Sequence, residues 1–288
     1  GWRKGDGAQE ENIFRRSTYY QTLDDLDDPE RRYVAHGAYP LGDYGCVYST
    51  EITCFRGEER DGYPLLKEPF RYDAIAVAAF RKPFLLKRPA PQRGPDAFDW
   101  RLDDRITVQT FKKVVTIFVT AARFGHRDLV LSALGCGAFS NPPEHVAEIF
   151  RVAVLMFGAY FRWIVFAIIN DHNSGKKFNP EGNFRPFERA FAPGAYRVHP
   201  VPAPFELVAD ELEPCQYGAY CTKIDDAAHR EQCFHPPMCP LEATSECPLD
   251  DETHFLLLRH QRTRCRVGNR ASPSPSPANS GGGGGGGG

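Results

Sequence analysis

The chain has 288 residues, of which 42% are hydrophobic and 12% aromatic, so it can bury one substantial core and still form a smaller unit. Lys and Arg (35) nearly balance Asp and Glu (37), which excludes an overall charge that would draw the chain to nucleic acid or to an anionic membrane. The most apolar stretch, 154–169, is interrupted by Arg162 and is shorter than the roughly 18 to 20 residues that a membrane span needs.

The first part of the chain predicts one helix and two strands. Residues 8–23 follow helical periodicity with acidic residues in the first turn, where the helix dipole favours negative charge. Segments 44–56 and 72–80 are rich enough in β-branched and apolar residues to be strands. The acidic run 23–32 indicates a solvated loop, and the Pro-rich segment 83–96 indicates a connection.

The middle of the chain predicts a βαβ unit. Residues 106–122 have apolar side chains every three or four positions, which is typical of a helix with one buried face. Buried strands are then expected at 128–134 and 163–169, separated by a glycine turn, 135–143, and a helix, 144–161. This order predicts an α/β fold with a parallel or mixed sheet covered by helices.

The composition changes near residue 200. We therefore expect a main domain over 1–200, a linker over 201–212 and a small unit over 213–265. Residues 266–288 contain Ser-Pro repeats and eight terminal glycines, which cannot bury enough apolar surface to fold and predict a disordered tail.

The glycine turn, "GCGAFSNPP", stands at the carboxyl end of a predicted strand, where open α/β sheets bind their ligands. Gly135 and Gly137 would let the backbone approach an anion, and the start of the next helix would offer unpaired N–H groups to a phosphate. A tight turn without a ligand explains the same glycines. Asn141 could contact phosphate or cap the helix, and we prefer the cap. Cys136 lies in no nucleophile elbow and has no His partner, so we interpret it as a small turn residue.

A second glycine-rich loop, "GWRKGDGAQEENIF", opens the chain and leads into a helix. Two such loops can clamp a diphosphate while an acid reaches the neighbouring sugar. This stretch resembles the Gln-Glu-Glu signature of microbial-type poly(ADP-ribose) glycohydrolases, which have a three-layer macrodomain fold with a mixed sheet. Gly1 stands at the last of the signature's three glycines, so the family's first strand and first two glycines are expected before residue 1. The segments "RRSTYY", "VYSTEITCFR" and "SALGCGAFSNPPEHVAEIF" extend the resemblance, in pieces, over about residues 1–192.

The resemblance implies roles for individual residues. Glu11 would be the acid/base, Glu10 would hold ribose hydroxyls and Gln9 would help to order the loop. Cleavage of the ribose bond needs a proton on the departing oxygen, and a like-charged neighbour helps a carboxyl group to keep one. The substrate-binding turn would consist of Gly135, Cys136, Gly137, Ala138, Phe139 and Asn141, with Phe139 against ribose or adenine. A core aromatic is the alternative for Phe139.

Six of the nine cysteines follow residue 214, among several histidines. An odd, clustered set favours metal binding in a reducing compartment, nuclear or cytoplasmic, over disulfides. The first set has the spacing C-x5-C-x7-H-x5-H and consists of Cys215, Cys221, His229 and His235. The second has the spacing C-x7-C-x6-H-x5-H and consists of Cys239, Cys247, His254 and His260. Matching ligands are 24, 26, 25 and 25 residues apart, which predicts two tandem fingers that hold one or two structural zinc ions; no organic cofactor is expected.

Two alternatives to tandem fingers stay open: a Cys-rich tail with accidental spacing, and a single finger that uses Cys233 or Cys239 as a ligand. The first finger, "CQYGAYC" followed by "HREQCFHPP", resembles poly(ADP-ribose)-binding zinc fingers. The family's aromatic-Arg pair is replaced here by Thr222 and Lys223, so adenine stacking would use Tyr217 or Tyr220, beside Lys223. The second finger lacks the glycine and both aromatics, and is expected to give structural support.

Both constellations indicate the same ligand. We expect a macrodomain-like hydrolase that releases ADP-ribose, with zinc fingers that hold it on poly(ADP-ribose) or on ADP-ribosylated proteins. The first alternative is a module that binds ADP-ribose without cleaving it. The second is a zinc-finger protein that binds nucleic acid or protein through its fingers, with the α/β domain as scaffold; the balanced charge and the few basic residues in the fingers oppose it.

Overall fold

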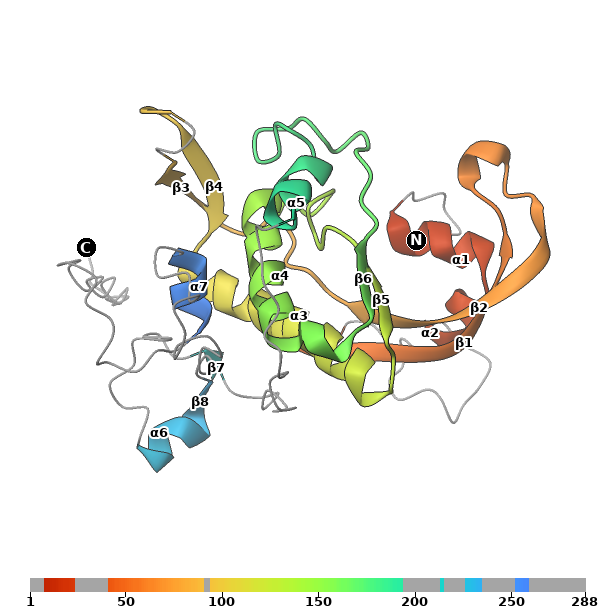
Figure 1. The fold of residues 1–288 in the computed structure, drawn as a ribbon, viewed down its shortest axis with the longest axis horizontal. Coiled ribbons are helices and arrows are strands. Elements are labelled where there is room, and N and C mark those ends of the chain that lie inside the picture. The colour runs from red at the N-terminus through yellow and green to blue at the C-terminus, as the bar shows by residue number, and fades with distance from the viewer. Residues whose placement is uncertain are drawn as a thin grey trace, which may run out of the picture.

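The computed structural model describes residues 8–23, 41–90, 94–193, 213–214, 226–234 and 252–258, which form a mixed α/β fold (Figure 1). The helices are α1 (Gln9–Arg16), α2 (Tyr19–Leu23), α3 (Asp104–Arg123), α4 (Pro143–Phe157), α5 (Phe184–Ala190), α6 (Ala227–Gln232) and α7 (Glu252–Leu257). The strands are β1 (Cys46–Arg56), β2 (Leu65–Val77), β3 (Leu85–Pro89), β4 (Phe98–Leu102), β5 (Asp128–Leu131), β6 (Trp163–Phe166), β7 (Glu213–Pro214) and β8 (Cys233–Phe234). None of the helices described is both long and apolar enough to span a membrane.

The main core lies between α3 and α4, which confirms the two helices predicted from apolar periodicity. α3 begins at an N-cap, Asp103, whose carboxylate accepts the N–H of Ile106 at 3.0 Å. Phe118 of α3 and Phe150 of α4 are almost fully buried, and Phe150 contacts Phe166 and Phe187 edge-on or tilted. These ring contacts hold β6 and α5 against the two central helices.

The predicted βαβ unit is confirmed. β5 and β6 are parallel, with Val130 opposite Val165, and α4 connects them. The prediction of two buried strands was wrong for one of their faces, because Val130 is 71% exposed and Val165 is 48% exposed. Side chains alternate along a strand, so only the face that carries Leu131 packs on the core. The strands in the described residues pair two by two, β1–β2, β3–β4, β5–β6 and β7–β8, and do not form one continuous mixed sheet.

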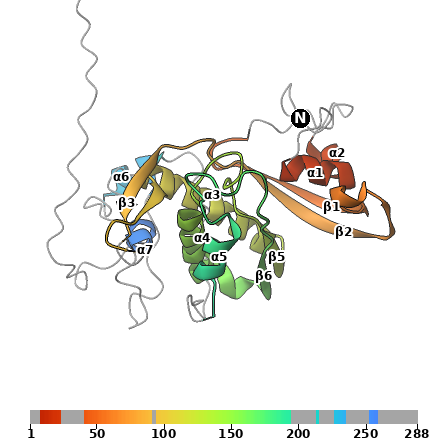
Figure 2. The same ribbon diagram turned by 90° about the horizontal axis from the view of Figure 1, so that it is seen from above.

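The N-terminal helices rest on the long β1–β2 hairpin, as Figure 2 shows. Phe14, Tyr19, Leu23 and Ile52 form a second, smaller apolar cluster there. The single helix predicted over 8–23 is interrupted at Ser17, which is extended and forms an isolated bridge with Cys54 of β1. Pairing with the neighbouring strand has replaced one turn of helix.

The segment predicted as a Pro-rich connection contains β3, which pairs antiparallel with the unpredicted β4. Among the described residues β3 pairs only with β4, so Pro89 lies on an edge strand, where proline is tolerated. The prediction of a connection was therefore wrong for Leu85–Pro89. The proline content of the segment indicated a connection, although a short apolar run was present.

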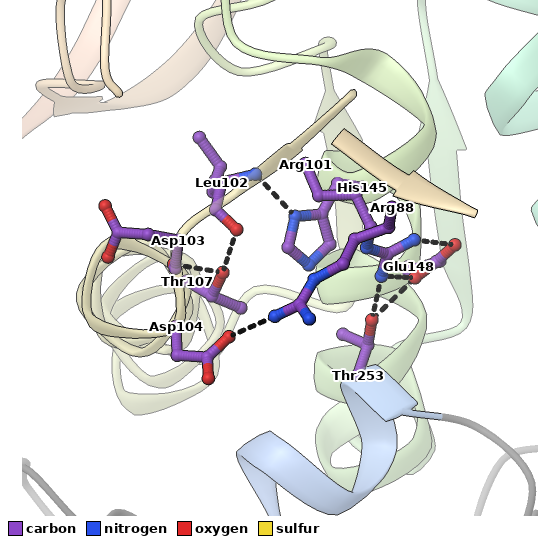
Figure 3. Close-up of polar contacts among 9 residues, drawn as sticks. All are labelled: Arg88, Arg101, Leu102, Asp103, Asp104, Thr107, His145, Glu148 and Thr253. Carbon is purple, nitrogen blue, oxygen red and sulfur yellow. Dashed lines mark hydrogen bonds and ion pairs between the residues drawn. The ribbon is translucent and has the colours of Figure 1, made fainter. Parts of the chain in front are cut away.

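α7 brings the C-terminal part of the chain onto the main core, where Leu257 and Leu258 are fully buried. Figure 3 shows the polar contacts beneath it: Arg101 of β4 forms a bidentate ion pair with Glu148 of α4, and the Thr253 hydroxyl donates to Glu148 at 2.6 Å. The Leu102 N–H donates to His145 Nδ1 at 3.0 Å. β4, α4 and α7 are thus joined by one buried polar network.

Candidate active site

The glycine turn after β5 is shaped by Gly135. Its φ is +73°, in the left-handed region, and a Cβ there would lie 2.5 Å from Asn141 Nδ2 and 2.7 Å from Ala79 Cβ. Both distances are shorter than real contacts, so the turn itself requires glycine at this position. Packing within the protein therefore explains one of the two glycines that indicated a ligand-binding turn.

Asn141 holds the turn together. The side chain is 1% exposed, and its Nδ2 donates to the carbonyl oxygens of Phe80 at 2.8 Å and Gly135 at 3.0 Å. The predicted helix cap was wrong, because the N-cap of α4 is Pro142 and no side chain caps it. Asn141 instead fixes the turn to the connection that follows β2.

Free backbone donors lie in the middle of the turn. The N–H groups of Cys136, Ser140 and Asn141 donate within the turn. In the part of the chain that the structure describes, the N–H groups of Gly137, Ala138 and Phe139 donate to no protein acceptor. The N-cap Pro142 and the first residue of α4, Pro143, have no N–H, so the backbone donors of the helix start begin only at Glu144. Successive free N–H groups in a turn suit an anion.

Gly137 and Phe139 leave space above these donors. A Cβ at Gly137 would meet only Asn173 Nδ2, at 3.9 Å, and Gly137 has no left-handed φ. The Phe139 ring is 38% exposed, which contradicts the core-aromatic alternative, while its carbonyl accepts the Lys82 N–H at 2.7 Å. The turn thus presents donors, an open approach and an aromatic face together.

Cys136 is fully buried, and burial raises the pKa of its thiol well above the ordinary value, with a smaller contribution from Glu144. A buried neutral thiol is a poor nucleophile. The interpretation of Cys136 as a small turn residue is therefore consistent with its surroundings.

The acidic pair lies in the first turn of α1, where Glu10 and Glu11 are half-buried and Gln9 is exposed. Among the described residues, Glu11 Oε2 is buried without a hydrogen-bond partner. A buried carboxylate oxygen normally has a partner, and a catalytic role is one explanation for an exception. Gly1 lies outside the described residues.

The two predicted halves of the site are held by different neighbours. Asn12 of α1 donates to Glu59 at 3.1 Å, beyond the far end of β1, and Arg16 donates to the Arg56 carbonyl at 3.3 Å. The glycine turn is held by residues just after β2. In the residues described, neither Gln9 nor Glu11 forms a hydrogen bond or ion pair with the turn. β2 links the two regions: it belongs to the hairpin that supports α1, and the connection after its last residue supports the turn.

The sequence analysis missed the loop 170–183, which adjoins the turn through Asn173. Fully buried Asn179 organises it: Nδ2 donates to the Asn173 carbonyl at 3.1 Å, and Oδ1 accepts the Lys176 N–H at 2.9 Å. Asn170 accepts the N–H groups of Asn183 and Phe184 at the base of the loop. The only signal in the sequence was the recurrence of asparagine, which is typical of ordered turns.

Most of the predicted finger residues lie outside the described residues, namely Cys215, Tyr217, Tyr220, Cys221, Lys223, His235, Cys239, Cys247 and His260. His229 lies on α6, beside the short β7–β8 pair, and His254 lies on α7. His254 is 2% exposed and belongs to a helix that packs on the main core, an environment that differs from a separate finger. The described residues contain no group of three or more candidate metal ligands.

Comparison with known proteins places the family signal at the N-terminus: residues 1–57 match the model for the microbial-type PARG (poly(ADP-ribose) glycohydrolase) catalytic domain. No curated protein matches the chain significantly. Among solved structures, the chain is similar to the Thermomonospora curvata poly(ADP-ribose) glycohydrolase bound to the inhibitor ADP-HPD, with 28% identity and a TM-score of 0.45. The similarity covers 65% of this chain and 64% of that one, so the chain spans slightly less than two thirds of that protein. It is also similar to the Deinococcus radiodurans glycohydrolase in complex with ADP-ribose, with 23% identity and a TM-score of 0.44 over 63% and 66%. The family match thus falls on the segment that carries Gln9, Glu10 and Glu11.

Proposed function

We propose that the chain hydrolyses the O-glycosidic ribose–ribose bonds of poly(ADP-ribose) and releases ADP-ribose. The observation that carries this proposal is the turn 137–139, where three free N–H groups adjoin an open glycine and an exposed aromatic ring. A diphosphate flanked by ribose and adenine matches that combination of donors and apolar surface. The family match over residues 1–57 supports the proposal, because this segment contains Glu11, the acid that a glycosidase would need.

The residues divide the reaction between them. The turn binds the diphosphate, Phe139 packs against ribose or adenine, and Glu10 holds ribose hydroxyls. Glu11 donates its proton to the departing ribose oxygen as the glycosidic bond breaks, and its carboxylate then takes a proton from the water that attacks the anomeric carbon. The buried Oε2 atom of Glu11 supports this role, because its hydrogen-bonding capacity is unused by the described residues.

The test is the replacement Glu11→Gln, with release of ADP-ribose from labelled polymer as the readout. The variant should lose hydrolysis, by about 10²-fold or more for removal of a general acid, while calorimetry shows unchanged ADP-ribose binding. Retained turnover would remove Glu11 from the acid/base role. A parent chain that binds ADP-ribose but never shortens polymer would be a binding module.

We also propose that the first Cys/His set holds one structural zinc and tethers the chain to polymer through Tyr217 or Tyr220. Three cysteines of the main domain, Cys46, Cys54 and Cys136, are free thiols, which supports a reducing, nuclear or cytoplasmic compartment. The replacement Cys215→Ser/Cys221→Ser should remove one equivalent of zinc, measured by elemental analysis. An unchanged zinc content would contradict this assignment.

A further inference from the structure

A patch of aromatic and lysine side chains lies on the β3–β4 hairpin and the neighbouring loop. It consists of Lys87, Phe98, Trp100 and Lys177, and is called the aromatic–lysine patch below. Lys87 Nζ lies 4.1 Å from the Phe98 ring centroid and 5.5 Å from that of Trp100, and Lys177 Nζ lies 4.5 Å from the Trp100 centroid. The two rings meet edge-on at 5.7 Å. Cations and ring faces are thus interleaved on one surface.

The two faces of the β3–β4 hairpin differ in whether their cationic side chains form ion pairs. Lys87 is opposite Trp100 and Pro89 is opposite Phe98, so alternate residues share the face of the patch. Arg88 and Arg101 lie next to patch residues in the chain and so belong to the opposite face of the hairpin. They pair with Asp104 and Glu148, and Figure 3 shows both pairs.

The patch cations lack such partners: within the described residues, neither Lys87 nor Lys177 forms an ion pair. Phe98 is 42% exposed. The part-buried Arg101–Glu148 pair therefore holds the hairpin from beneath, while its outer face is available to a ligand.

A single ordered loop connects the patch to the glycine turn. Asn173 lies beside Gly137, and Lys176 Nζ donates to Asn173 Oδ1 at 2.9 Å. Lys177 follows directly and contacts Trp100. In Figure 1 this loop leaves β6 and extends over the top of the molecule towards β4 before it returns to α5. Buried Asn179 fixes the loop, so the patch and the turn keep a constant relation to each other.

We propose that the aromatic–lysine patch binds a second ADP-ribose unit of the polymer, next to the unit held by the glycine turn. This inference rests on the proposed function of the turn. Each unit of the polymer has one adenine, whose face can stack on an aromatic ring, and one diphosphate, whose charge lysines can neutralise. The balanced charge of the whole chain argues against a general polyanion surface, and the continuity with the turn favours polymer over single-stranded nucleic acid.

The test compares monomeric ADP-ribose with poly(ADP-ribose) as ligands of the full chain. The double variant Lys87→Glu/Lys177→Glu and the variant Phe98→Ser should each weaken polymer binding about 10-fold or more, as expected when one base stack or its cations are lost. Binding of monomeric ADP-ribose should not change. The matched control is Lys67→Glu, an exposed lysine on β2 outside the patch, which should leave both affinities as in the parent.

The outcomes separate this inference from the function on which it rests. A parent chain that does not bind monomeric ADP-ribose would refute the proposed function. Monomer binding with a polymer affinity that neither variant lowers would refute the second subsite alone. Single-stranded oligoadenylate is the competitor that tests for nucleic acid. If it competes as strongly as the polymer itself, and if the same variants lose its binding, the patch is a nucleic-acid site and the proposal is overturned.

Discussion

The two glycines of the turn should respond in opposite ways to the same small change. Gly135→Ala adds a methyl group where the turn is closed, and Gly137→Ala adds one where it is open. We expect the first to destabilise the fold and the second to leave the fold intact but impair ADP-ribose binding, because its methyl group would occupy the approach of the diphosphate.

The magnitudes follow from the contacts. Alanine at a left-handed φ costs about 1–2 kcal/mol. The new Cβ of Gly135→Ala also lies 2.5 Å from Asn141 Nδ2, so the amide must move and weaken two hydrogen bonds, each worth about 1 kcal/mol. The expected loss is therefore about 3–4 kcal/mol. Gly137→Ala should stay within about 0.5 kcal/mol of the parent.

Gly125→Ala is the matched control. Gly125 has a φ of +79°, and nothing lies within 4 Å of the position that the added methyl group would take, so this variant measures the backbone cost alone. Urea unfolding measures the three stabilities, and calorimetry measures ADP-ribose affinity. If Gly135→Ala loses no more stability than Gly125→Ala, the steric argument is wrong. If Gly137→Ala binds ADP-ribose as the parent does, the ligand does not approach there, and the turn loses its proposed role.

Two further predictions concern the buried network beneath α7. Burial, assisted by Arg101, lowers the pKa of His145 from 6.5 to about 3, so between these values the unfolded chain binds a proton that the folded chain does not. The free energy of unfolding should therefore fall as pH falls below 6.5, by about 2 kcal/mol at pH 5. The variant His145→Asn keeps an acceptor for the Leu102 N–H but cannot titrate. An equally steep pH dependence in this variant would contradict the assignment to His145. Thr253→Val removes the hydroxyl that donates to Glu148 and should lower the free energy of unfolding by about 1–3 kcal/mol, measured by urea unfolding. A loss below about 0.5 kcal/mol would argue against a structural role for this hydroxyl.

Local pattern was enough to predict the elements whose signal is repeated along the chain. α3 and α4 were predicted because a buried helical face recurs every three or four residues, and β5 and β6 because a short apolar run is bounded by turns. The candidate turn was predicted for a similar reason, since two glycines after a strand indicate an unusual backbone. β3 was missed because the prolines of segment 83–96 indicated a connection, and its run of apolar residues is short.

The sequence by itself determined which residue types stand at the candidate site: two acids at a helix start, and two glycines followed by an aromatic residue. Only the tertiary structure decided that Gly135 serves packing while Gly137 stays open, that Asn141 braces the turn, and that Phe139 faces outward. It also joined Trp100 to Lys177, far apart in the chain, on one surface. The physical reason is that exposure and partnership depend on neighbours brought together by folding, whereas periodicity is a property of adjacent residues alone.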